Sequence, residues 1–327
     1  MELTLKQILE RFPLRVSITD YCNLHCFFCS NEGMNKERRD STNIDVDDFA
    51  YLLNVLMDNG LEHISLTGGD PTLHPELKRI LDIINESNIQ RSFFHTNGIE
   101  LDESLIMNQL YPFTKIAVSI HTTDFDTWRK ITRGTKEQYD KLTNNLNLLG
   151  REGYGKKIEI KHVPIYGIND TDEIIKGTLD LCARYSFKFK FLNFEPIENQ
   201  HQRLIIPLGD LVAKLEGLGC RKIEKEWMFR GQTDYLPANF FEYNGTEGFA
   251  IEIGCGEQSV CRTCYKSNEI FLTPNLELKP CHISPVSISL KAAIDNQDLG
   301  KILAKLVDSR IFLFQRPGEG KTYWNQD

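Results

Sequence analysis

Three cysteines, Cys22, Cys26 and Cys29, stand at C-x3-C-x2-C spacing directly after a run of β-forming apolar residues. Thiolates are the ligands that iron-sulfur clusters and soft metal ions select. Three thiolates on one short loop leave one cluster position open unless a distant residue fills it, and an open iron is a place for chemistry. From spacing alone, the alternative is a structural zinc knuckle, which needs a fourth ligand such as His25.

A second group of cysteines lies near the other end of the chain. Cys261 and Cys264 form C-x2-C, Cys281 follows after sixteen residues, and Cys255 precedes Cys261 by six. Three of these thiols would again leave one iron open, whereas Cys255 as a fourth ligand would close the cluster. A zinc ribbon is the alternative that this spacing permits.

The first cysteine group resembles the signature of the radical S-adenosylmethionine (SAM) superfamily, C-x3-C-x-aromatic-C, with Phe28 as the aromatic residue. In that family the three thiolates hold a [4Fe-4S] cluster, and SAM chelates the fourth iron. The resemblance implies reductive cleavage of SAM to a 5′-deoxyadenosyl radical, which removes a hydrogen atom from the substrate. It also implies a low-potential electron donor of the flavodoxin or ferredoxin class. Cys255, where it is not a ligand, would be a candidate hydrogen-atom donor to a substrate radical.

Polar residues follow the expected second, third and fourth strands, in Thr67-Gly68-Gly69-Asp70, His95-Thr96-Asn97-Gly98 and Ser119-Ile120-His121. Each segment could be an ordinary turn. In radical SAM proteins the matching strand ends face SAM, and the Gly-Gly-acid segment contacts its amino group. The resemblance therefore assigns SAM binding to Phe28, Gly68, Gly69, Asp70, Thr96, Asn97, Ser119 and Glu195.

The elements that must position these residues are short β-type runs alternating with amphipathic helical stretches, which predicts an α/β fold with a parallel sheet. Apolar residues at i, i+3, i+4 and i+7 mark two helices, at Phe49 to Leu56 and at Leu77 to Ile84. The resemblance implies a partial (β/α)6 TIM-like barrel, whose chemistry lies at the carboxyl ends of the strands. We expect strands near residues 14–19, 62–67, 91–96, 115–121, 157–165 and 187–194.

The alternation stops near residue 200, which predicts two domains. Residues 1–200 would form the radical SAM partial barrel, and residues 201–327 an auxiliary iron-sulfur domain of the twitch or SPASM type. Within the second part we expect a helix from Leu208 to Leu218 and a helical tail from Leu290 to Phe314.

The chain has 327 residues and a net charge of −8, which argues against broad binding of nucleic acid or acidic membranes. No apolar stretch is long enough to span a bilayer, and the N-terminus has no signal-peptide pattern. We therefore expect a cytoplasmic protein. Its nine cysteines are then better read as reduced metal ligands than as a disulfide set.

The second cysteine group and the segment 166–173 resemble the GTP 3′,8-cyclase branch of the superfamily, which acts in molybdenum cofactor biosynthesis. Members hold the triphosphate with basic residues; Arg15 is retained here and Lys190 stands for an Arg. Other basic positions are replaced, and Glu159 should repel an anion because it shares a strand face with Lys161. The expected substrate site consists of Arg15, Glu159, Lys161, Lys190 and Lys266.

These departures lead to the expectation of a radical SAM enzyme with two [4Fe-4S] clusters, acting on a substrate other than GTP. A peptide matured by crosslinking or epimerisation, or a sugar, nucleoside or amino acid, would be that substrate. The alternative is the GTP 3′,8-cyclase itself. An alternative from another functional class is a non-catalytic zinc or iron-sulfur protein. That alternative does not explain the polar residues at the strand ends.

Overall fold

Six parallel strands form the centre of the sheet, and strands that follow one another in the chain lie side by side. Over the described residues the whole sheet has twelve strands. This computed structural model describes residues 9, 13–29, 40–110, 112–194, 199–225, 238–252, 270–279 and 287–314. The central strands confirm the six predicted ones: β1 (Leu14–Ser17), β2 (His63–Thr67), β3 (Arg91–Thr96), β4 (Lys115–Ser119), β5 (Ile158–His162) and β6 (Lys188–Leu192).

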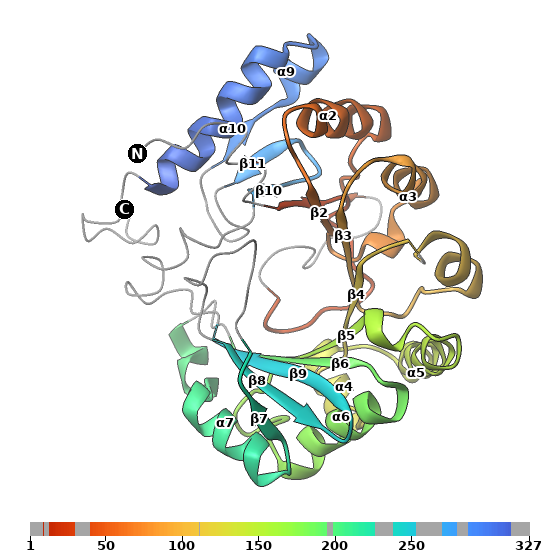
Figure 1. The fold of residues 1–327 in the computed structure, drawn as a ribbon, viewed down its shortest axis with the longest axis vertical. Helices are drawn as coiled ribbons and strands as arrows, with labels where there is room; N and C mark the ends of the chain where they lie inside the picture. The colour runs from red at the N-terminus through yellow and green to blue at the C-terminus, as the bar shows by residue number, and fades with distance from the viewer. Residues whose placement is uncertain are drawn as a thin grey trace.

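Helices cover the outer side of this sheet (Figure 1). The two predicted apolar helix faces are confirmed, because the periodic apolar residues from Phe49 to Leu56 and from Leu77 to Ile84 are buried in α2 and α3. Short 3-10 and π segments fill several connections: η2 (Pro71–Leu73), η3 (Leu105–Gln109), η4 (Gly155–Lys157) and η5 (Asn199–Leu204). The helices are α2 (Val46–Asp58), α3 (Leu77–Glu86), α4 (Phe125–Thr132), α5 (Lys136–Arg151), α6 (Asp172–Tyr185), α7 (Leu208–Gly217), α9 (Lys291–Asp295) and α10 (Leu299–Phe314).

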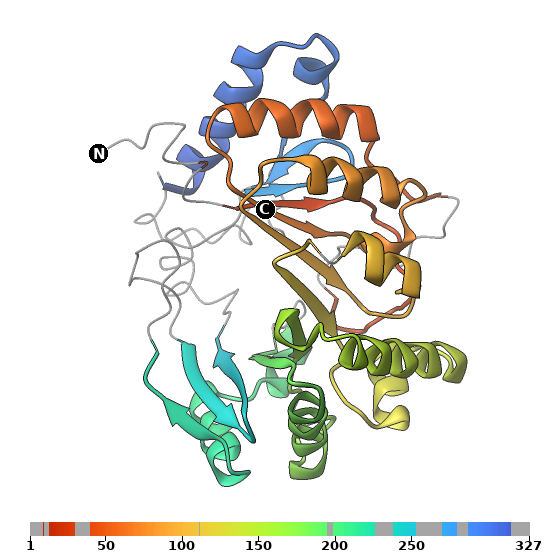
Figure 2. The same cartoon turned by 45° about the vertical axis from the view of Figure 1, so that its right-hand side comes forward.

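Strands from the last third of the chain extend both edges of the central six. Strand β9 pairs with β6, and β10 pairs with β1, both in parallel; the remaining late pairs are antiparallel. Figure 2 shows the two late groups at opposite ends of the sheet. The late strands are β7 (Arg221–Ile223), β8 (Ala238–Tyr243), β9 (Thr246–Ile251), β10 (Ile270–Leu272), β11 (Glu277–Lys279) and β12 (Ile288–Ser289).

The sheet is open rather than a closed barrel, because its order runs from β12 at one edge to β7 at the other. This confirms an α/β fold with a parallel sheet and a partial barrel. The predicted helix from Leu208 and the helical tail from Leu290 are confirmed by α7, α9 and α10. The domain division at residue 200 stays a prediction. No helix among the described residues combines the length and apolar character that a membrane span requires.

The two faces of the central strands differ in chemistry. The residues that alternate toward the helices are apolar and fully buried, as Val16, Leu66 and Phe94 illustrate. The opposite face carries Arg15 on β1 and Lys161 on β5. Strands of a parallel sheet are usually apolar on both faces. A polar inner face therefore indicates a binding site inside the curve of the sheet.

Candidate active site

The cysteine loop follows β1 directly, and all three of its thiols are partly buried. Burial, with the charge of Asp70, raises the pKa of Cys22 to about 12. Burial also raises the pKa of Cys26, and the charges of Cys29 and Cys22 add to that effect. The three thiols therefore lie close enough to interact, although no three Cys, His, Asp or Glu side chains of the described residues form a ready-made metal site. As a donor set, three soft thiols on one loop fit an iron-sulfur cluster.

The end of α4 holds the middle of the cysteine loop. The backbone N–H of His25 donates to Thr132 O at 2.9 Å, and that of Phe27 donates to Ile131 O at 3.2 Å. The His25 side chain is exposed. The loop is thus fixed by its backbone, and also by Leu24, which is buried in the main core, and by Phe27 and Phe28, which pack against the apolar cluster around Ile131.

The glycines after β2 fit against the backbone of the cysteine loop. The N–H of Gly69 donates to Thr19 O at 2.8 Å, and the N–H of Asp70 donates to Tyr21 O at 2.8 Å. A Cβ on Gly69 would lie 2.1 Å from Tyr21 O, and one on Gly68 would lie 2.5 Å from Thr19 O. Only glycine permits this approach, so the turn after β2 and the start of the cysteine loop form one unit.

Asp70 joins the ends of β2 and β3. Its buried carboxylate accepts hydrogen bonds from the Thr96 hydroxyl at 3.0 and 3.1 Å and from the N–H of Asn97 at 2.6 Å. Burial outweighs these hydrogen bonds and raises the pKa of Asp70. The Asn97 side-chain amide lies 3.7 Å from Cys22 Sγ, so the network runs from Asp70 to the cysteine loop. The predicted cofactor residues Gly68 to Asp70, Thr96 and Asn97 thus lie together.

At the end of β4, Ser119 and His121 flank the same region. His121 is buried and has a φ of 58°, a left-handed conformation that is uncommon for a residue with a Cβ. Its Nδ1 accepts from the N–H of Val163 at 3.2 Å, and its ring meets the Phe28 ring edge-on at 5.0 Å. Burial and then the charge of Lys161 lower the pKa of His121 to about 4, so its imidazole is neutral. Backbone strain of this kind clusters at functional sites.

The expected repulsion from Glu159 is offset in the structure. Its carboxylate is buried and lies 3.3 Å from Lys115 Nζ on the neighbouring strand. Burial alone would raise the pKa of Glu159, but the charges of Lys115, Lys190 and Lys161 outweigh it and lower that pKa. Glu159 does share a strand face with Lys161, as predicted. Glu159 pairs with Lys115 and offsets one positive charge, so basic side chains still outnumber the acid on this face.

Three residues of the inner face were not part of the predicted site. They are Lys115, Ser65 and His95. Lys115 is the register partner of Phe93, and Ser65 is the register partner of Arg15. His95 forms one hydrogen bond with Ser65 and another with Lys161. The signal that could have found Lys115 is strand alternation, since it stands four residues before Ser119. Six predicted residues lie outside the described part of the chain, and their roles stay predictions: Glu195, Cys255, Cys261, Cys264, Lys266 and Cys281.

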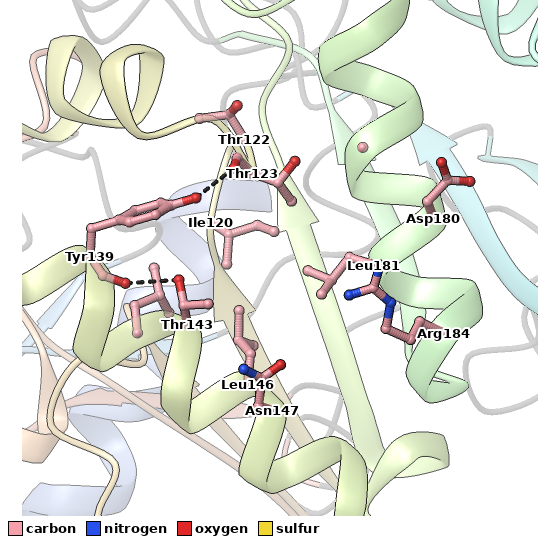
Figure 3. Close-up of a pocket in the computed structure, with 12 residues that line it drawn as sticks. Ile120, Thr122, Thr123, Tyr139, Thr143, Leu146, Asn147, Asp180, Leu181 and Arg184 are labelled. Carbon is pink, nitrogen blue, oxygen red and sulfur yellow. Dashed lines mark hydrogen bonds between the residues drawn. The ribbon is translucent and has the colours of Figure 1, made fainter.

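A separate pocket of about 330 Å³ lies on the helical side of the sheet, between α5 and α6 (Figure 3). Its walls include Leu146 and Leu181, and the Tyr139 hydroxyl donates to Thr123 O at its rim. None of the predicted site residues lines it. This pocket therefore does not belong to the candidate site.

Comparison with known proteins identifies the family and several relatives. The family model described as the Radical SAM superfamily matches residues 16–182. The GTP 3′,8-cyclase of Clostridium acetobutylicum is 27% identical over 88% of this chain and 86% of its own length. The GTP 3′,8-cyclase of Synechocystis is also 27% identical, over 77% of this chain and 73% of its own length.

Among solved structures, Streptococcus suis SuiB bound to S-adenosylmethionine has a TM-score of 0.61 and 17% identity. The match covers 90% of this chain and 66% of SuiB. At this identity the likeness concerns the fold alone, and it agrees with the open parallel sheet described above.

The relatives contradict the expectation of a substrate other than GTP. The curated relatives that match over most of their length are named GTP 3′,8-cyclases, including one from Thermodesulfovibrio yellowstonii. The expectation depended on lost cations and on Glu159, and the structure pairs Glu159 with Lys115. The family match spans just over half of the chain and includes the three cysteines of the first loop. The chain therefore belongs to the radical SAM superfamily, which implies an enzyme that uses a [4Fe-4S] cluster and SAM.

Proposed function

We propose that this protein is a radical SAM enzyme that cyclises GTP by joining C3′ of the ribose to C8 of the base, the reaction for which its curated relatives are named. The observation that carries the proposal is the charge of the inner face. Among the described residues of this face, four basic side chains lie around one acid, which is paired. They are Arg15 on β1, Lys115 on β4, Lys161 on β5 and Lys190 on β6, with Glu159 as the acid.

A triphosphate brings about four negative charges at neutral pH. Charge-assisted hydrogen bonds to phosphate are the strong ones, and they gain strength where water is excluded. Lys161 on β5 and Lys190 on β6 are register partners on adjacent strands. Arg15 lies on β1, beside Ser65 of β2. An anion inside the curve of the sheet would therefore meet cations from several strands at once.

We assign the catalytic cluster to Cys22, Cys26 and Cys29, in agreement with the signature spacing. When bound, the reduced cluster and SAM together supply the one-electron chemistry that removes a hydrogen atom from the substrate. The protein side chains position these groups. Asp70 and Asn97 hold the end of β3 against the cysteine loop. Gly69 sets the distance between the end of β2 and that loop. Phe28, Thr96 and Ser119 complete the SAM contacts, and Gly68 and Glu195 belong to the same assignment.

We assign a second [4Fe-4S] cluster to Cys261, Cys264 and Cys281, with Cys255 as a fourth ligand or a free thiol, in an auxiliary domain after residue 200. Anaerobic reconstitution should then give about eight irons per chain, since each cubane holds four. Replacing Cys22, Cys26 and Cys29 with Ala should remove half of them. Stoichiometric zinc without iron would contradict both assignments.

Incubation of the reconstituted protein with GTP, SAM and dithionite tests the proposed reaction. We expect GTP to be consumed and a cyclised nucleotide that retains the triphosphate to form. Lys190→Met should raise KM at least tenfold, because one charge-assisted bond to phosphate is worth about 1.5 to 3 kcal/mol. The matched control is Lys176→Met on α6, whose exposed side chain pairs with Asp180 on the outer surface. Cleavage of SAM without any conversion of GTP would refute the proposed substrate.

A further inference from the structure

A row of three hydrogen-bonded side chains crosses the inner face of the sheet. Lys161 Nζ on β5 lies 2.6 Å from His95 Nδ1 on β3, and His95 Nε2 lies 2.8 Å from Ser65 Oγ on β2. Strand β4 runs between β3 and β5, and its residue beside His95 is Ala117. Because a methyl group is small, Lys161 can reach across β4 to the imidazole.

The charges that face this row are mostly positive. Charged or titratable groups from five strands surround Lys161, whose side chain is partly buried. Its strand neighbour Glu159 is already paired with Lys115. Glu159 is the acid among the strongest electrostatic influences on Lys161 from the described residues. The titratable and charged groups that surround it are Arg15 from β1, His95 from β3, Lys115 from β4, Glu159 from β5, Lys190 from β6 and His121 after β4.

In this arrangement Lys161 and His95 cannot both carry a positive charge. An ammonium and an imidazolium 2.6 Å apart would repel, and His95 Nδ1 must be unprotonated to accept a hydrogen bond from Lys161. Burial, followed by the charges of Lys190 and Arg15, lowers the pKa of Lys161 well below its ordinary value. Burial and the charge of Lys161 likewise lower the pKa of His95. The free site therefore holds fewer protons than its composition suggests.

We propose that Lys161 and His95 form a proton-accepting pair in the substrate site, which takes up one proton when a polyphosphate binds and thereby gains a cation for it. The proposal rests on the phosphate-binding role given to this face above. An arriving phosphate reverses the balance of charge around the pair, so the charged form becomes the favoured one. The Ser65 hydroxyl anchors the imidazole from the other side and keeps Nδ1 directed at Lys161.

The sign of the pH dependence follows from linkage. The pair is already charged at a pH below its free-state pKa, so no proton is taken up there. Between the free-state and bound-state pKa values, binding requires one proton, and affinity falls about tenfold for each pH unit of increase. Above about pH 7.5 the terminal phosphate is itself ionised, so proton uptake in that range reports on the protein and not on the ligand.

Isothermal titration calorimetry of the reconstituted, SAM-loaded protein tests the proposal, with inorganic tripolyphosphate and GTP as separate probes. Titrations in buffers of different ionisation enthalpy, from about pH 7.5 to 9, give the number of protons taken up. We expect about one proton per bound ligand for both probes. Lys161→Arg should still bind but take up no proton, since its guanidinium stays charged. Lys176→Met on the outer surface should leave uptake unchanged.

Binding of both probes without proton uptake by the native protein would overturn the inference, as would uptake that persists in Lys161→Arg. Failure of both probes to bind would overturn it too. These results are separable from the proposed reaction. Tripolyphosphate binding with uptake but no conversion of GTP would refute the cyclase and leave the proton-accepting pair standing. Conversion of GTP without uptake would do the reverse.

Discussion

At the scale of single residues, Gly69 sets how closely the second strand end approaches the cysteine loop. Its N–H bonds to Thr19 O, and the space for a side chain is occupied by the backbone of Tyr21. The resemblance to radical SAM proteins assigns SAM binding to these glycines. In the structure, the group that they approach is the loop that carries the proposed cluster ligands.

Gly69→Ala should therefore damage the cofactor site. A Cβ 2.1 Å from Tyr21 O forces the backbone to move, and we expect a loss of about 1 to 3 kcal/mol of stability and at least half of the iron bound by the first cysteine group. Iron analysis and thermal denaturation after anaerobic reconstitution measure both effects.

Gly209→Ala on α7 is the matched control, because a Cβ there meets open space. Alanine in a helix is about 1 kcal/mol more favourable than glycine, so this variant should be at least as stable as the native protein. Full iron content in Gly69→Ala would show that the close approach is not needed.

Only some of the charged residues on the inner face could be placed from the sequence. Arg15, Lys161 and Lys190 could be placed on the inner face from strand alternation alone. The pairing of Glu159 with Lys115 could not, because it depends on the register between β4 and β5, which juxtaposes Glu159 and Ala117 and brings the lysine within reach. A carboxylate that reads as a repulsive charge in the sequence is a neutralised one in the fold.

At the scale of elements, the strand ends are tied to one another. Asp70 after β2 accepts hydrogen bonds from Thr96 and Asn97 at the end of β3, and Asn97 in turn contacts Cys22. The carboxyl ends of β1, β2 and β3 thus form one connected rim. A change in this network should therefore alter the proposed cluster site, although Asp70 is not one of the proposed cluster ligands.

Asp70→Asn tests that connection. An amide keeps one acceptor oxygen but brings an NH2 group to a buried position that now accepts from several donors, so at least one donor loses its partner. We expect a loss of about 1 to 3 kcal/mol in denaturation and slower cleavage of SAM to 5′-deoxyadenosine.

Asp47→Asn provides the control, because Asp47 is an exposed acid at the start of α2 that pairs with Arg79 on the surface. That variant should change stability by no more than about 0.5 kcal/mol and leave SAM cleavage intact. Equal stability and SAM cleavage in Asp70→Asn and the native protein would contradict the role given to this network.

The central strands were predictable because each is a short β-forming run that recurs between amphipathic helices. Their ends were less so: the run predicted for 115–121 stops at Ser119, where His121 adopts a left-handed conformation. The run predicted for 157–165 stops at His162, and Val163 and Ile165 join a separate apolar cluster instead. The late strands β10 and β12 have only three and two residues, too short for a periodic signal.

At the scale of the whole molecule, the late strands could not have been placed from sequence. Strand β10 pairs with β1 across more than 250 residues of chain, Leu14 with Ile270, and no local pattern encodes such a contact. With β9 beside β6, the last third of the chain lines both edges of the partial barrel. The second cysteine group stands in the sequence between these two strands, at 253–269, and after β11.

An isotope label on GTP tests whether the proposed reaction takes place at C3′. A bond from C3′ to C8 forms only if the hydrogen on C3′ leaves. With GTP deuterated at C3′, SAM, dithionite and reconstituted protein, mass spectrometry should find one deuterium in 5′-deoxyadenosine and none at C3′ of the nucleotide product. Formation of unlabelled 5′-deoxyadenosine with the deuterated GTP recovered intact would contradict the proposed cyclisation.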